Sequence, residues 1–247
     1  MSDVVWLFAA GVVAGVVSVV ASLASLVSYP ALLAVGVPPL AANVTNTTAL
    51  VFVGFGSAAG SRPELAGQRP RLLRLGLLNA VGGGIGAALL LLTPASAFEA
   101  VVPWLIAAAS LVLLAGPGLR PDQPGGREGS TVLNAAVLAV AVYTGYFGAA
   151  GGVLVLAVLT ALLDEPLVRT IALKNVVSSV ANAVAAVIFA LFGPVDWSAV
   201  PPLALGFLVG GRLGPALVRR LPGDALRVFI ALCGLGVAVK LGIDTYG

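Results

Sequence analysis

Residues 4–37 read VVWLFAAGVVAGVVSVVASLASLVSYPALLAVGV, and residues 131–163 read TVLNAAVLAVAVYTGYFGAAGGVLVLAVLTALL. Neither stretch contains an Asp, Glu, Lys or Arg. As a single helix, each would be on the order of 50 Å long, whereas the hydrocarbon core of a membrane is about 30 Å thick. Both have small residues or breakers at their middle: Ser22, Ser25 and Ser28 before Tyr29-Pro30, and Gly145, Gly148, Gly151 and Gly152. Each stretch is therefore predicted to be a broken helix or a hairpin with a short second arm.

The rest of the chain is equally apolar. Of 247 residues, 60% are hydrophobic and only 9% are charged, whereas soluble domains carry about 25% charged residues. Eight hydrophobic blocks follow one another at residues 4–37, 40–60, 72–92, 98–115, 131–163, 167–192, 197–217 and 225–243. Spanning β-barrels would instead show short alternating apolar and polar runs. The fold class predicted is an all-α integral membrane protein with several spans, located in a bacterial inner membrane.

The blocks divide into two similar sets of four. In each set the long block precedes a helix that opens with polar residues, and two further spans complete the set. Residues 1–115 are thus predicted to be a first membrane repeat, residues 116–130 a linker loop and residues 131–247 a second repeat.

Loop charge decides between two topologies, because cytoplasmic loops carry an excess of Lys and Arg. If all eight blocks cross the membrane once, seven cations fall inside and six outside, which is no bias. If both long blocks are hairpins, twelve of the 13 cations lie inside and only Lys240 lies outside. The hairpin topology is favoured. It makes the halves an inverted repeat, the plan of many secondary transporters.

The candidate substrate-binding residues are the polar residues at the starts of the second and sixth blocks and the glycines in the middle of the fifth block. Polar groups at membrane depth are costly, so they usually face a cavity or the bundle interior. A glycine break exposes backbone N–H groups, and a half-helix N-terminus attracts anions. The nine candidates are Asn43, Thr45, Asn46, Gly148, Gly151, Gly152, Lys174, Asn175 and Ser178. Ordinary hydrogen bonding between helices, small-residue packing and, for Lys174, snorkelling to the interface are the alternative readings.

The order of these features resembles the sulfite exporter TauE/SafE family of bacterial membrane permeases. The likeness covers nearly the whole chain. It is carried by residues 15–30 with Val37-Pro38-Pro39, residues 145–152, Val195-Asp196-Trp197, Gly210-Gly211-Arg212 and Arg219-Arg220-Leu221-Pro222. One departure stands out: the family's glycine cluster is present as Gly151-Gly152, but its first copy is Leu23-Ala24-Ser25.

The resemblance implies a transporter, most simply an exporter, of small anions such as sulfite, an organosulfonate or a related sulfur anion. An enzyme is disfavoured, because the chain has no His and the cores of the apolar blocks hold no Asp or Glu for acid–base or metal chemistry. With one cysteine, Cys233, no cysteine metal cluster can form. No cofactor, metal or nucleic-acid partner is expected; the partners are the anion and the lipid bilayer. An anion channel and a non-catalytic structural membrane subunit remain alternatives, and the sequence does not give the oligomeric state.

Overall fold

The chain folds into a bundle of α-helices. The computed structural model describes residues 2–21, 23–115, 130–147, 151–163, 165–218 and 223–246, and each regular element within them is a helix. Ser22, Gly148 and the motif Arg219-Arg220-Leu221-Pro222, all named above, lie outside these ranges, as does the predicted linker except for Ser130.

Each predicted hydrophobic block corresponds to helix in the structure. The helices of the first half are α1 (Ser2–Ala21), α2 (Ser25–Ala34), α3 (Pro39–Gly60), α4 (Arg62–Leu65), α5 (Arg69–Leu92) and α6 (Ala95–Ala115). Those of the second half are α7 (Thr131–Tyr146), α8 (Gly151–Leu162), α9 (Leu167–Phe192), α10 (Val200–Val218) and α11 (Gly223–Tyr246). The short α4 was not predicted.

Both long blocks are broken into a long and a short helix, as the sequence predicts. The first divides between α1 and α2, and the second between α7 and α8. Pro30 does not mark the break, because it lies inside α2. Pro38 and Pro166 do bound a helix: they stand in extended conformation directly before α3 and α9, respectively.

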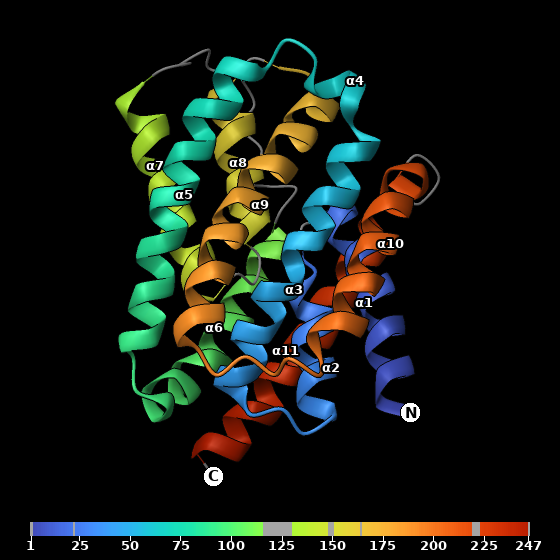
Figure 1. Cartoon of the computed structure of the whole chain (residues 1–247), viewed down its shortest axis with the longest axis vertical. Helices are drawn as coiled ribbons and strands as arrows, with labels where there is room; N and C mark the ends of the chain where they lie inside the picture. The colour runs from blue at the N-terminus through green and yellow to red at the C-terminus, as the bar shows by residue number, and fades with distance from the viewer. Residues whose placement is uncertain are drawn as a thin grey trace.

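The two ends of the bundle are occupied by different parts of the chain. Figure 1 shows both termini at one end and α4 at the other, with α1 starting at the first end and α7 at the second. The short helices α2 and α8 therefore begin inside the bundle and run back toward opposite ends. The repeat relation between the halves stays a prediction.

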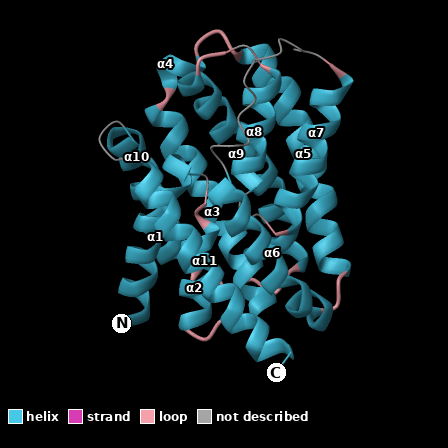
Figure 2. Cartoon of the chain, turned by 180° about the vertical axis from the view of Figure 1, so that it is seen from behind, coloured by secondary structure: helices cyan, strands magenta, loops and turns pink. Residues whose placement is uncertain are grey.

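Helices of one predicted half pack mainly on helices of the other. Helix α1 packs on α10, α7 on α5, and α3 on α9, and Figures 1 and 2 show the first two pairs at opposite flanks of the bundle. Glycines allow this close approach: a Cβ added at Gly11 would lie 2.6 Å from the Leu203 carbonyl oxygen, and one at Gly210 would lie 2.9 Å from Gly15 Cα. Small residues at such crossings are typical of membrane helices.

The outer surface is apolar. Large hydrophobic side chains stand exposed along several helices, including Leu77 at 68% and Phe192 at 76% exposure. In the described part of the chain, Arg69–Leu92 and Arg169–Phe192 are each long and apolar enough to cross a membrane, and five shorter apolar helices accompany them. Such a surface suits lipid rather than water.

We predict that Gly86→Ala destabilises the protein. A Cβ at Gly86 would collide with the Val142 carbonyl oxygen and lie 2.7 Å from the Tyr146 nitrogen, both backbone atoms of α7. Overpacking of this kind costs about 1–3 kcal/mol, which thermal unfolding of the detergent-solubilised protein would measure. Gly84→Ala on the same helix is the matched control, because its Cβ would make an ordinary contact, 3.4 Å from the Val184 side chain. Equal unfolding temperatures for the two variants would contradict the packing described.

Candidate functional site

A polar cavity lies where the two breaks meet α3 and α9. Its volume is about 50 Å³, room for roughly three to five water molecules. Nine of the 13 lining residues have a hydroxyl, amide or amine side chain, and Leu50 and Val53 form an apolar face. The lining residues are Ser18, Ala24, Ser25, Leu50, Val53, Ser57, Thr144, Gly152, Lys174, Asn175, Ser178, Ser179 and Asn182.

Helix α9 supplies the most polar wall. Lys174, Ser178 and Asn182 are spaced four residues apart, so they form one stripe along the helix. Asn175 and Ser179 extend this stripe on its flank, and the Ser179 hydroxyl donates to the Asn175 carbonyl at 2.6 Å. The Ser178 hydroxyl and the Asn182 side-chain oxygen are buried without a hydrogen-bond partner among the described residues. They are therefore available to a molecule in the cavity.

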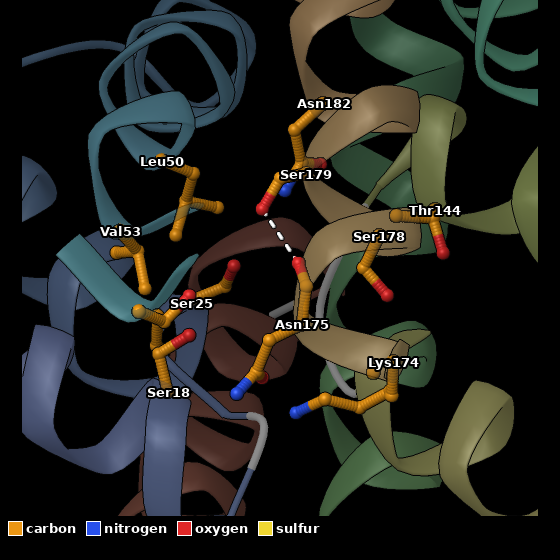
Figure 3. A pocket seen from close by; sticks show the side chains of 13 residues that line it. Ser18, Ser25, Leu50, Val53, Thr144, Lys174, Asn175, Ser178, Ser179 and Asn182 are labelled. Atoms are coloured by element: carbon orange, nitrogen blue, oxygen red, sulfur yellow. Dashed lines mark hydrogen bonds between the residues drawn. The ribbon is translucent and has the colours of Figure 1, made fainter. Parts of the chain in front are cut away.

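Lys174 places an amine inside the bundle. The side chain is only 2% exposed, so the structure does not support snorkelling to the interface. Figure 3 shows the amine of Lys174 and the amide of Asn175 extending in the same direction from α9 toward the helices of the first half. Among the described lining residues, Lys174 is the one Asp, Glu, Lys or Arg, so it is the side chain that can bring a positive charge to the wall.

The two short helices start at this cavity. Ser25 is the first residue of α2 and Gly152 the second residue of α8, and both line the wall. The N-terminal end of a helix carries a partial positive charge of about half an elementary charge. Two such ends and one lysine converge on a single small space, an arrangement whose electrostatics favour an anion over a cation.

The predicted residues of α3 do not line the cavity; they hold its parts in place. Asn46 Nδ2 donates to Ser25 Oγ at 3.1 Å, and the Ser28 hydroxyl lies 2.6 Å from Asn46 Oδ1 and 2.9 Å from the Ala24 carbonyl oxygen. These bonds fix the start of α2 beside the cavity. Asn46 is 1% exposed, so it is a buried structural partner of the cavity wall.

Asn43 and Thr45 make contacts to other elements. The Asn43 amide donates to the Tyr146 carbonyl at the end of α7, at 3.1 Å. The Thr45 hydroxyl accepts from the Asp196 backbone N–H at 2.9 Å, which ties the loop between α9 and α10 to α3. In the structure, Asn43 and Thr45 thus form hydrogen bonds between elements, as the alternative interpretation of these residues predicts.

Gly151 is buried beside the cavity without lining it. A Cβ there would collide with the Thr144 hydroxyl, which lines the wall and donates to the Val140 carbonyl at 2.8 Å. The glycine therefore allows α8 to approach α7 at the break. The third predicted glycine, Gly148, lies outside the described residues.

Of the nine predicted residues, the structure brings four to the cavity: Gly152, Lys174, Asn175 and Ser178. Whether these bind a substrate stays a prediction. Sequence reasoning missed Ser18, Ser57 and Thr144, since isolated hydroxyls in apolar helices commonly bond their own backbone and give little signal. In the described part of the chain, no group of His, Cys, Asp and Glu could hold a metal ion.

A charged cluster joins the two halves at the end that holds α4. Glu165 forms ion pairs with Arg71 of α5 and with Arg169 of α9, the latter at 3.0 Å. Arg169 also donates to the carbonyl oxygens of Glu64 and Ala66, at 3.3 and 2.9 Å. Because Arg169 stands five residues before Lys174, the cluster lies little more than one turn of α9 from the cavity wall.

The apolar surface and the small polar cavity at two broken helices define a class of protein, a membrane transporter. The chain belongs to the sulfite exporter TauE/SafE family, whose sequence profile matches residues 7–241. It is therefore a membrane transporter and not an enzyme.

The relatives extend over almost the entire chain. The probable membrane transporter protein ORF9 of a Sinorhizobium species is 25% identical over 249 residues, covering 97% of this chain and 92% of that protein. The probable membrane transporter protein YfcA of Escherichia coli K12 is 26% identical, covering 98% and 90%. A probable membrane transporter protein of Haemophilus influenzae is 24% identical, covering 96% and 94%. No solved structure matches the chain.

Proposed function

We propose that the protein exports a small sulfur oxyanion, with sulfite as the first candidate, through the cavity between α3 and α9. The family to which it belongs is described by sulfite export. The observation that carries the proposal is the convergence of Lys174 with the N-terminal ends of α2 and α8 on one small cavity. Transporters with broken helices use such ends to bind the anionic groups of their substrates.

The size of the cavity favours a compact ion. Space for roughly three to five water molecules suits sulfite, which has four non-hydrogen atoms, better than a longer organosulfonate. The hydroxyls of Ser25 and Ser178 would supply donors around the ion, and Lys174 the countercharge, whereas the unpartnered side-chain oxygen of Asn182 is an acceptor and would suit a water molecule or a protonated oxygen of the ion. Because hydrogen bonds to charged groups are worth about 1.5–3 kcal/mol, a few of them replace much of the ion's hydration.

The same proposal includes the orientation of the protein in a bacterial inner membrane. The end that holds α4 carries Arg62, Arg69, Arg71 and Arg74 at the start of the connection to α5 and along its first turns. By the excess of cations on the inside, this end would face the cytoplasm and the termini would face outward. The opposite starting ends of α1 and α7 (Figure 1) support an inverted repeat with one central site.

We predict that Lys174→Met raises the sulfite concentration at half-maximal flux by on the order of ten- to a hundredfold, the equivalent of one lost charge-assisted contact. Methionine keeps an unbranched stem and removes a buried charge, so the fold should persist. Sulfite efflux from proteoliposomes measures the effect. Lys240→Met is the matched control, because Lys240 is the other lysine of the chain and is exposed on α11.

Unchanged half-saturation in Lys174→Met would contradict the proposed site. Flux that rises linearly with sulfite concentration, without saturation, would contradict a carrier and identify the protein as a channel.

We also predict the sidedness of the loops. Single cysteines on a Cys233→Ser background, at the exposed positions Ala66 in the α4–α5 connection and Ser198 before α10, should react differently with an impermeant thiol reagent applied to intact cells. The cysteine at Ser198 should be labelled and the one at Ala66 should not, until the cells are made permeable. The opposite pattern would overturn the orientation, and labelling of both would overturn the assignment of the two loops to opposite sides.

A further inference from the structure

A buried hydroxyl outside the cavity has no hydrogen-bond partner in the described part of the chain. Tyr29 of α2 is 2% exposed, and its phenolic oxygen is fully enclosed and unpartnered. Burying such a group without a partner costs free energy, so its presence in a native protein needs a physical reason. A phenylalanine would fill the same space without that cost.

Tyr29 lies between the cavity and the end of the bundle that holds the termini. It follows the cavity-lining Ser25 by four residues on α2, which is about one helical turn, or roughly 6 Å. Figure 1 shows α2 running from the interior of the bundle toward the end with the termini. An ion leaving the cavity at that end would pass this turn of α2.

Aromatic rings close the same region. The Tyr29 ring packs edge-on against Phe147, with centroids 6.0 Å apart, and Phe98 contacts Phe147 and Tyr146 at 6.1 and 6.2 Å. Phe147 follows the cavity-lining Thr144 by three residues on the second half of the chain. These four residues form an aromatic cluster that spans both halves next to the cavity. Within it, the Tyr146 hydroxyl has a contact to Thr93, whereas the Tyr29 hydroxyl has none in the described residues.

We infer that Tyr29 contacts the transported oxyanion on its way out, by donating its phenolic hydrogen to the ion when the aromatic cluster opens. The inference rests on the proposed function. A hydroxyl bonds a charged acceptor more strongly than a neutral one, so Tyr29 would draw the ion out of the cavity. Because the phenol is uncharged, it would not retain the ion as a second lysine would.

A nearby carboxylate, that of Glu99, offers another explanation for the buried hydroxyl of Tyr29. The carboxylate of Glu99, exposed on α6, is close enough to act electrostatically on Tyr29. If the phenol served Glu99 instead of a passing anion, the two residues would form one structural unit. Since a carboxylate repels an oxyanion, the two explanations predict opposite effects of Glu99→Gln on efflux.

The test combines stability with transport. Tyr29→Phe should raise the thermal unfolding temperature, because an unpartnered buried hydroxyl is removed, and should lower sulfite efflux from proteoliposomes by at least about fivefold, because the ion loses a donor. Tyr246→Phe is the matched control: its hydroxyl has partners in Trp104 and Ala100, so this variant should gain no stability and keep its efflux. Glu99→Gln should leave efflux unchanged or raise it.

Three results would overturn the inference. Tyr29→Phe with wild-type efflux would show that the hydroxyl has no part in transport. A less stable Tyr29→Phe would show that the hydroxyl has an internal partner, and a Glu99→Gln variant as slow as Tyr29→Phe would identify that partner. Failure of the proposed function is separable, because the unaltered protein would then give no sulfite efflux at all.

Discussion

Backbone N–H groups cannot remain without partners in the apolar interior of a membrane, and the structure is organised around the two places where a helix begins there. At the first, the N–H groups of Leu26 and Val27 donate to the carbonyl oxygens of Leu23 and Ala24, both at 3.0 Å. The serines and asparagine around the start of α2 satisfy one another through side-chain hydrogen bonds. The result is a polar region inside an apolar bundle, with the cavity at its centre.

The position of this polar region depends on how the helices of the two halves pack on one another. Because α1 packs on α10 and α7 on α5 through glycine crossings, each broken segment is held by a helix from the other half of the chain. Helices α3 and α9 meet between them, where a Cβ at Gly54 would collide with Ser179. At the end with α4, Glu165 and its two arginines fasten the same halves together. The cavity thus lies between elements from both halves of the chain.

Most of the fold could be predicted from the sequence, because uncharged runs of 20 or more residues have few alternatives to membrane helix. The broken blocks were predictable from their excess length alone. The position of the first break was less so: Pro30 suggested a boundary, but the structure keeps it inside α2 and places the break before Ser25. The hydrophobic pattern of the sequence does not show which glycines and hydroxyls contact a neighbouring helix, because this depends on how the helices pack.

The cavity was only partly predictable for the same reason. Lys174 and its α9 neighbours stood out because amines and amides are costly in a membrane. Asn43, Thr45 and Asn46 stood out equally, yet their side chains bond other elements and leave the wall to Ser25. Ser18, Ser57 and Thr144 could not be distinguished from hydroxyls that merely bond their own helix. Tyr29 carried no signal at all, since the absence of a hydrogen-bond partner is a property of the fold.

The central claim is that the cavity between α2, α8 and Lys174 binds the transported oxyanion. The most direct measurement is anomalous diffraction from crystals of the protein grown with selenite, in which selenium takes the place of the sulfur of sulfite. The account predicts one strong selenium peak within hydrogen-bonding reach of Lys174, beside Ser25 and Gly152. A selenium peak confined to the arginine-rich end near α4, with none in the cavity, would contradict it.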